Sequence, residues 1–244
     1  MKKLIIVLIF FMLFINQAFA CFDTYLFLKK SSMVYPKKSL VLEANGEYSF
    51  TKFKDPSEDM FFTFGNLYYG VSDRFSIQMS IGSGEKPRGE FKLDSYGIRG
   101  VYNVYTSPIR FFTVDFILEQ RGMFTEQANE IEISTPVIFY GNTFTYVVHP
   151  TFNYGLNSEN FTLGGHLGLF YNLSSSSLVG LGIEYASVHS SSYAGQRLTE
   201  SESSTSVFFG TYLGNRLYLQ NEIAKGLSNS RDIGFALTTK FIIN

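Results

Sequence analysis

A histidine and a serine near residue 190 stand at a spacing that suits ester hydrolysis. His189 and Ser191 are separated by one residue, in a stretch that is rich in serine. A histidine that accepts the proton of a serine hydroxyl makes that oxygen a nucleophile, and a third polar group orients the histidine. Glu200 or Glu202 could supply this third group. The sequence thus contains one candidate catalytic set, His189, Ser191 and Glu202, although a chance pair arises easily among so many serines.

A second set of residues offers charge instead of a nucleophile. Its members recur at alternate positions of segments that are otherwise apolar, and the acids outnumber the bases seven to three. They are Glu43, Glu47, Asp115, Glu119, Glu132, Glu184 and Glu222, with Arg99, Arg121 and Lys240, and with His149 and His166. Carboxylates around a water-filled interior favour cations, whereas charges that pair with one another fill the interior, because buried charge must be compensated. The sequence leaves both a cation-leaning pore and a filled interior open.

The sequence gives little indication of a metal site, a cofactor site or a nucleic-acid-binding surface. His149, His166 and Glu184 fall on three separate segments, which is a weak pattern for metal ligands, so we expect structural histidines. One cysteine excludes a disulfide framework and a cysteine-based zinc site. The net charge is -1 and there is no long basic run, which argues against DNA or RNA as a partner. We therefore expect no metal and no cofactor.

The elements that must position these residues are strands. Twelve segments alternate apolar and polar residues with a period of two, as where Phe75, Ile77 and Met79 alternate with Ser76 and Gln78. The segments are 40–50, 61–71, 75–82, 95–104, 112–119, 131–140, 144–154, 161–172, 178–187, 204–213, 217–224 and 233–243. The second, sixth and tenth are apolar on both faces in places. A strand of about ten residues, tilted, is long enough to cross a bilayer.

The connections between these segments alternate in length. The short ones are 72–74, 106–108, 141–142, 174–177 and 214–216, and the long ones are 51–59, 83–90, 121–130, 156–160, 188–203 and 226–232. Short turns at one end, long loops at the other and an even number of strands are typical of bacterial outer-membrane barrels. The ring must close, because an open edge in hydrocarbon leaves amides unpaired. We therefore predict an all-β fold, a single twelve-stranded antiparallel transmembrane β-barrel over residues 39–244.

Closure in lipid turns the apolar face outward and the polar face into the lumen. Charged residues make up 17% of the chain, against about a quarter in typical globular proteins, as expected when alternate side chains meet lipid. Tyrosines near the segment ends are expected to form an aromatic girdle: Tyr69, Tyr102, Tyr146, Tyr154, Tyr171 and Tyr185. Four glycines are expected to point inward and leave room there: Gly164, Gly168, Gly180 and Gly182. The alternative is a soluble lipocalin-like barrel with its apolar face inward, which usually has about eight strands.

The N-terminus carries the pattern of an export signal. Lys2 and Lys3 precede an apolar run over 4–15, and the small residues Ala18 and Ala20 mark a cleavage site. We predict a signal peptide over residues 1–20 that is cleaved during export. A membrane-anchoring helix, or a lipid attached to the cysteine that follows, are the alternatives. No later apolar stretch is long enough for a transmembrane helix.

Residues 21–38 lie between this signal and the first strand. They carry Lys29, Lys30, Lys37 and Lys38. The segment is either a periplasmic extension or a plug that enters the lumen. As a plug, its lysines would offset the acidic wall.

The hairpin at residues 67–77 resembles a known family. Its sequence, Leu67-Tyr68-Tyr69-Gly70-Val71-Ser72-Asp73-Arg74-Phe75-Ser76-Ile77, is similar to a hairpin of Gram-negative outer-membrane barrels of the kind described as transporters of the phenol-degradation MetA pathway. The resemblance implies the outer membrane of a Gram-negative bacterium, contact with its lipids and with the barrel-assembly machinery, and passage of small hydrophobic or aromatic solutes. Such proteins usually end in Phe, whereas here Phe241 stands three residues before the terminal Asn244.

The His-x-Ser pair is similar to that of outer-membrane phospholipase A and of lipid A deacylases. If the strand before it extends, His189 and Ser191 face the lipid at the level of the outer leaflet, where a lipid esterase needs them. Those families follow the serine with Asn, whereas Ser192 stands here. We expect a barrel that passes small solutes or is purely structural. A lipid esterase, tested by loss of ester release in Ser191→Ala, is the alternative.

Overall fold

The computed structural model describes residues 22–50, 60–85, 92–109, 111–124, 129–157, 161–187, 201–228 and 232–243. These ranges contain one short helix, α2 (Thr24–Leu28), and thirteen strands. The strands are β1 (Leu40–Phe50), β2 (Met60–Ser72), β3 (Phe75–Glu85), β4 (Lys92–Thr106), β5 (Phe112–Met123), β6 (Asn129–Ser134), β7 (Val137–Tyr140), β8 (Phe144–Gly155), β9 (Phe161–Asn172), β10 (Ser177–Ala186), β11 (Glu202–Leu213), β12 (Leu217–Ser228) and β13 (Ile233–Ile243). Within these ranges, no helix combines the length and the apolar composition that crossing a bilayer requires.

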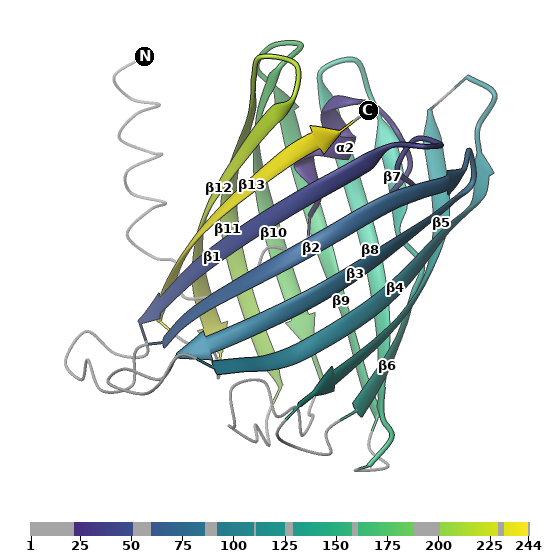
Figure 1. The fold of residues 1–244 in the computed structure, drawn as a ribbon. Helices are drawn as coiled ribbons and strands as arrows, with labels where there is room; N and C mark the ends of the chain where they lie inside the picture. Colours follow the sequence, from purple (N-terminus) through teal and green to yellow (C-terminus); the bar gives the residue numbers. More distant parts are fainter. Residues whose placement is uncertain are drawn as a thin grey trace, which may run out of the picture.

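The strands form one closed antiparallel barrel (Figure 1). Strands that follow one another along the chain are hydrogen-bonded neighbours, and β1 closes the ring by pairing with β13, where Glu43 lies opposite Lys240. β6 and β7 share one position in the wall, because both pair with β5 on one side and with β8 on the other. The thirteen strands therefore occupy twelve positions around the ring. The predicted twelve-stranded antiparallel barrel is confirmed.

The break between β6 and β7 is the one place where a predicted segment, 131–140, is not a continuous strand. It falls at Thr135 and Pro136. Proline has no N–H to donate to a strand ladder. The Pro136 carbonyl instead accepts a hydrogen bond from the Asp115 backbone N–H at 3.0 Å. The other predicted segments coincide with strands to within a few residues at each end.

The apolar face of the barrel points outward, as predicted. Met79 on β3 is 50% exposed, whereas Val41 and Ile117, at inward positions of their strands, are buried. The six tyrosines expected in the girdle are all exposed. The alternative of a soluble barrel with its apolar face inward is therefore wrong.

The outward position of Met79 makes the lipid-facing side testable. Met79→Arg is expected to lower the free energy of unfolding by about 2–4 kcal/mol, because it places a charge in hydrocarbon near the middle of a strand. Gln78, the preceding residue, lines the interior, so Gln78→Arg is the matched control and is expected to cost less. Urea unfolding of the protein refolded in lipid vesicles, followed by gel mobility without heating, measures both. Equal losses would contradict the outward orientation.

Residues 22–39 fold back into the barrel, and we refer to them as the plug. Figure 1 shows α2 inside the ring, at the end where the C-terminus lies. Phe22 packs edge-on against Phe170 of β9 and Phe208 of β11, with ring centroids 5.3 and 5.7 Å apart. Tyr35 stacks on Tyr68 of β2 with centroids 4.5 Å apart. The plug thus contacts widely separated parts of the wall at the short-turn end.

Glycines in the wall make room for these rings. A Cβ added to Gly180 on β10 would collide with the ring of Phe170, and one added to Gly168 on β9 would meet both Phe170 and Phe22. Glycine inside a strand commonly marks such a close approach. These two belong to the four glycines expected to point inward, and aromatic side chains occupy the space that they leave.

The four lysines of the plug do not offset the acidic wall, so that expectation is wrong. Lys29, Lys30, Lys37 and Lys38 are exposed at the short-turn end. The plug enters the lumen with its apolar side chains, because burying those removes apolar surface from water, whereas burying four ammonium groups would cost their hydration. Lys29 and Lys30 follow α2, and Lys37 and Lys38 lie in the turn before β1; both places remain in contact with solvent.

Candidate functional site

On the long-loop side of the plug, the barrel encloses a charged cavity of about 460 Å³. Its acidic lining residues are Asp23, Glu43, Glu47, Glu119, Glu130, Glu132, Glu184 and Glu202, and its basic ones are Arg99, Arg121 and Lys240. Side chains of a strand alternate between the two faces of a sheet, so every second residue of each strand points into the interior of the barrel. Carboxylates outnumber cations eight to three in the described lining.

Most of the residues predicted for the lumen line this cavity, and two do not. Asp115 is covered by the plug, where it accepts hydrogen bonds from the backbone N–H of Met33 at 2.6 Å and from Asn103 Nδ2 at 2.7 Å. Glu222 is buried outside the cavity lining. Strand alternation identifies inward positions but not which of them the plug covers. Strand alternation also cannot indicate that Asp23 lines the cavity, because Asp23 belongs to the plug and not to a strand.

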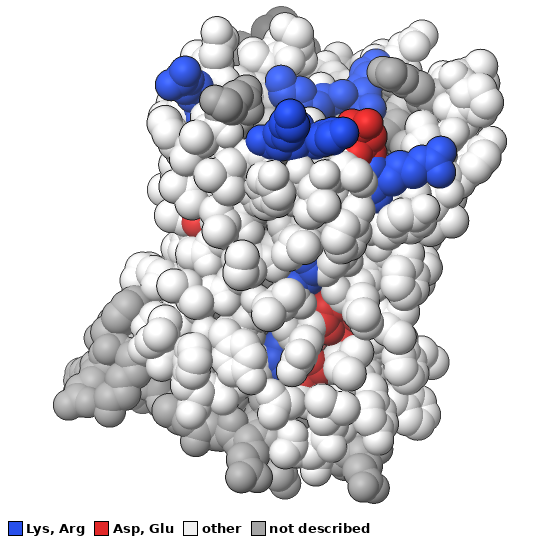
Figure 2. All heavy atoms as spheres, turned by 45° about the vertical axis from the view of Figure 1, so that its right-hand side comes forward, with Lys and Arg blue, Asp and Glu red and all other residues white. Residues whose placement is uncertain are grey.

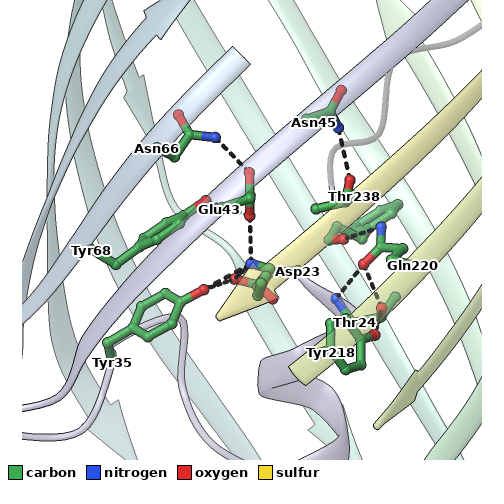
Figure 3. A network of polar contacts seen from close by, with 12 residues as sticks. Asp23, Thr24, Tyr35, Glu43, Asn45, Asn66, Tyr68, Tyr218, Gln220 and Thr238 are labelled. Carbon is green, nitrogen blue, oxygen red and sulfur yellow. Dashed lines mark hydrogen bonds and ion pairs between the residues drawn. The ribbon is translucent and has the colours of Figure 1, made fainter. Parts of the chain in front are cut away.

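Lys240 on β13 ties the plug to the wall. Its Nζ lies 2.7 Å from Asp23 Oδ2 and 2.8 Å from Glu43 Oε2 of β1, and it donates a hydrogen bond to the Tyr35 hydroxyl at 2.8 Å. Figure 3 shows these three partners close together. The Lys240 side chain is 2% exposed. A buried ammonium group requires such compensation, so one cation is shared by a carboxylate of the plug and a carboxylate of the wall. We call Lys240, Asp23, Glu43 and Tyr35 the latch.

Further donors reach Oδ2 of Asp23 and both carboxylate oxygens of Glu43. Burial, together with the nearby Asp23 charge, raises the pKa of Tyr35 well above its ordinary value. The Tyr35 hydroxyl therefore keeps its proton, and it donates to Asp23 Oδ2 at 2.5 Å. Glu43 accepts hydrogen bonds from Asn66 Nδ2 at 2.5 Å and from the Tyr68 hydroxyl at 3.0 Å. Each of the two carboxylates thus accepts hydrogen bonds from several donors, with Lys240 common to both.

A second group of hydrogen bonds fixes the start of the plug (Figure 3). Thr24 Oγ1 donates to Gln220 Oε1 of β12 at 2.5 Å, and Gln220 Nε2 donates to the Phe22 carbonyl at 3.1 Å. The Thr24 hydroxyl is also hydrogen-bonded to that of Tyr218. Farther along the plug, the Tyr140 hydroxyl of β7 donates to the Ser31 carbonyl. The plug is therefore anchored on several sides of the ring.

The opposite wall carries an ion-pair network across three neighbouring strands. Arg99 of β4 lies 2.5 Å from Glu119 of β5, measured from Nη2 to Oε2. Arg121 lies 2.7 Å from Glu119 and 2.9 Å from Glu132 of β6. The two arginines share Glu119 as an acceptor, so the network holds its charges in fixed positions along the cavity wall.

His149 and His166 lie on adjacent strands, and their ring centroids are 5.4 Å apart. His149 is 5% exposed and lines the cavity, and neither of its ring nitrogens has a hydrogen-bond partner among the described residues. His166 Nδ1 lies 3.7 Å from Glu184 of β10. In the described ranges, no three His, Cys, Asp or Glu side chains are arranged to hold a metal ion. The two histidines thus add polar ring nitrogens to the wall of the cavity.

The candidate hydrolytic set is only partly described. His189 and Ser191 lie outside the described residues. Glu202, at the first position of β11, lines the cavity inside the barrel. The lipid esterase stays a prediction.

No protein-family model matches the sequence, and no curated protein matches it. The fold, in contrast, is similar to those of solved outer-membrane barrels. The COG4313 outer membrane channel from Pseudomonas putida F1 has a TM-score of 0.66 and 10% sequence identity, covering 86% of this chain and 97% of its own. The NanC porin has a TM-score of 0.61 and 10% identity over 82% and 98%. The KdgM porin has a TM-score of 0.58 and 9% identity over 84% and 99%.

These similarities define a class of fold. The chain forms the closed antiparallel barrel that outer-membrane channels and porins use. Because the sequence identities are near 10%, these structural similarities establish the fold and nothing about the function. The narrower resemblance to transporters of the phenol-degradation MetA pathway stays a prediction.

Proposed function

We propose that this chain is an outer-membrane protein of a Gram-negative bacterium that gives small solutes passive passage through its barrel. The observation that carries the proposal is the charged cavity of about 460 Å³ inside the wall. The apolar outer face fits a lipid environment, and outer-membrane lipids and the barrel-assembly machinery are the expected partners. Export through a cleaved signal peptide over residues 1–20 belongs to the same proposal.

The lining favours hydrophilic solutes, and cations over anions. Rings of carboxylates favour cations in a pore, and eight carboxylates face three basic side chains in the described lining. Passage of small aromatic solutes, which the MetA-pathway resemblance implies, finds less support in a lining with so many charged side chains. The named neighbours support channel function as a class: two are called porins and one an outer membrane channel.

Selectivity in planar lipid bilayers tests this proposal. In a KCl gradient, the reversal potential is expected to report a permeability for K⁺ above that for Cl⁻, both in the wild type and in a variant that lacks residues 22–38. Replacing two cavity carboxylates, in Glu47→Gln with Glu202→Gln, is expected to bring the two permeabilities closer together, because the field of the lining is weakened.

Glu222→Gln is the matched control, since it removes a buried carboxyl group that is not part of the cavity lining. It is expected to leave the reversal potential unchanged. Preference for Cl⁻, or an equal effect of the control, would contradict the acidic-lumen account. Absence of channel events in the variant without residues 22–38 would contradict passage itself.

A further inference from the structure

A second hollow lies on the other side of the plug, at the short-turn end. It measures about 740 Å³. It is lined by the outer surface of the plug and by residues near the strand ends that surround it, among them Asp73 between β2 and β3, Thr106 at the end of β4 and Asn215 between β11 and β12. The hollow therefore lies across the mouth of the barrel, within the circle of short turns.

This hollow is strongly basic. Lys29, Lys30, Lys37 and Lys38 all line it, and Asp73 is the one carboxylate in its described lining. Among the described residues, none of the four lysines makes an ion pair, although Lys29 Nζ lies 4.9 Å from the centroid of the Tyr212 ring. Figure 2 shows Lys and Arg side chains gathered at this end of the molecule, above a largely uncharged flank. Four ammonium groups thus face one carboxylate in the same concave space.

Two of the lysines occupy backbone positions that favour glycine. Lys30 has a φ of 48° and Lys38 a φ of 65°. Lys30 follows the C-cap of α2, where its N–H donates to the Phe27 carbonyl and the N–H of Ser31 to the Leu26 carbonyl. This is a Schellman motif, which usually has Gly at this position because a Cβ is strained there.

Lys38 sits at the third position of a turn in which the Ser39 N–H donates to the Pro36 carbonyl at 2.9 Å. A positive φ at this position also favours Gly. Strained backbone persists where the surrounding structure holds it, and it clusters at functional sites, among them those that bind ligands. Both strained residues contribute an ammonium group to the same hollow.

We propose that this hollow binds a small multivalent oxyanion, a solute with two or more phosphate or carboxylate groups. Four lysines around one concavity can each donate to a separate oxygen, whereas a monovalent anion would engage fewer of them. The ligand reaches the site along the barrel axis, because the hollow lies inside the circle of turns and not on the lipid-facing flank. Its occupant is thus a dissolved anion and not the phosphate headgroup of a lipid. The site is separate from the acidic cavity, and the plug lies between them.

Titration of the purified full chain in detergent micelles with inorganic pyrophosphate tests this site. Calorimetry at low salt, where screening is weak, is expected to detect binding to the wild type. The double variant Lys30→Gly with Lys38→Gly is expected to bind about tenfold more weakly or worse, because it removes two of the four charges. Glycine suits both backbone positions, so the variant is expected to fold, and heat-modifiable gel mobility checks that it does.

Arg74→Gln with Arg216→Gln is the matched control. It removes two exposed charges from turns at the same end of the barrel, and neither residue lines the hollow. This control is expected to keep the affinity of the wild type. The proposal is overturned by a wild type that does not bind pyrophosphate, by unchanged binding in the glycine variant, or by an equal loss in the control. Binding of anionic lipid in nanodiscs without binding of pyrophosphate would also overturn it.

Discussion

Removal of residues 22–38 is expected to raise the conductance of single channels in planar bilayers severalfold. The plug separates the two hollows of the barrel: Phe22, Asp23 and Leu26 face the acidic cavity, whereas Tyr25 and Lys29 face the basic one. The current through a pore is limited by its narrowest part, and here packed aromatic rings narrow that part. Without the plug, the acidic cavity would continue to the short-turn end.

A variant with two point substitutions distinguishes an effect of plug release from an effect of misfolding. Asp23→Asn with Tyr35→Phe keeps the whole chain but removes the charge and the hydroxyl that hold the plug to Lys240. It is expected to show brief openings of the larger conductance. Lys37→Gln, in the same segment but outside the latch, is the control and should behave like the wild type. If the deletion variant folds, by heat-modifiable mobility, and conducts no better than the wild type, the plug is not the obstruction.

Lys240→Met is expected to destabilise the protein by about 2–4 kcal/mol, because it leaves two partly buried carboxylates without their shared cation. Asp23 and Glu43 both lie within 3 Å of the lysine nitrogen, and Asp23 belongs to the plug. Urea unfolding in detergent micelles measures the loss. Proteolysis of the N-terminal segment, followed by mass spectrometry, is expected to accelerate because the plug is released first.

Replacing Asp23 and Glu43 by neutral residues is expected to restore most of the stability that Lys240→Met removes. The triple variant Lys240→Met, Asp23→Asn, Glu43→Gln contains no unpaired charge, and replacement of a whole buried ion cluster is often close to neutral. Lys37→Met is the control for removal of an exposed lysine, and it is expected to change stability by no more than about 0.5 kcal/mol. A triple variant as unstable as Lys240→Met would show that the lysine stem, and not the charge balance, holds the plug.

The barrel could be predicted from the sequence because the pattern that defines each strand lies within a short stretch of the chain. Each strand alternates apolar and polar residues over about ten positions, and Met79 and Gln78 show how completely adjacent residues are sorted between lipid and lumen. The break at Pro136 could have been foreseen, since proline cannot donate to the ladder. The alternating pattern on its two sides nevertheless suggested one strand.

The plug and its latch were not predictable by the same means. Residues 22–39 have no period that indicates a partner, and their contacts depend on residues far away in the chain, such as Lys240, which lies 217 positions from Asp23. The acidic excess in the lumen follows from inward parity alone. Inward parity does not show which carboxylates form ion pairs, which ones the plug covers, or where the lysines of the plug reach solvent. These depend on how the barrel closes and on how the plug folds inside it.

The latch also imposes an order on assembly. Glu43 belongs to the first strand and Lys240 to the last, and they lie opposite each other in the pairing that completes the ring. The seat that receives Asp23 is therefore created by the final seam of the barrel. A barrel that has not closed lacks this paired site, so docking of the N-terminal segment indicates that β1 and β13 have paired.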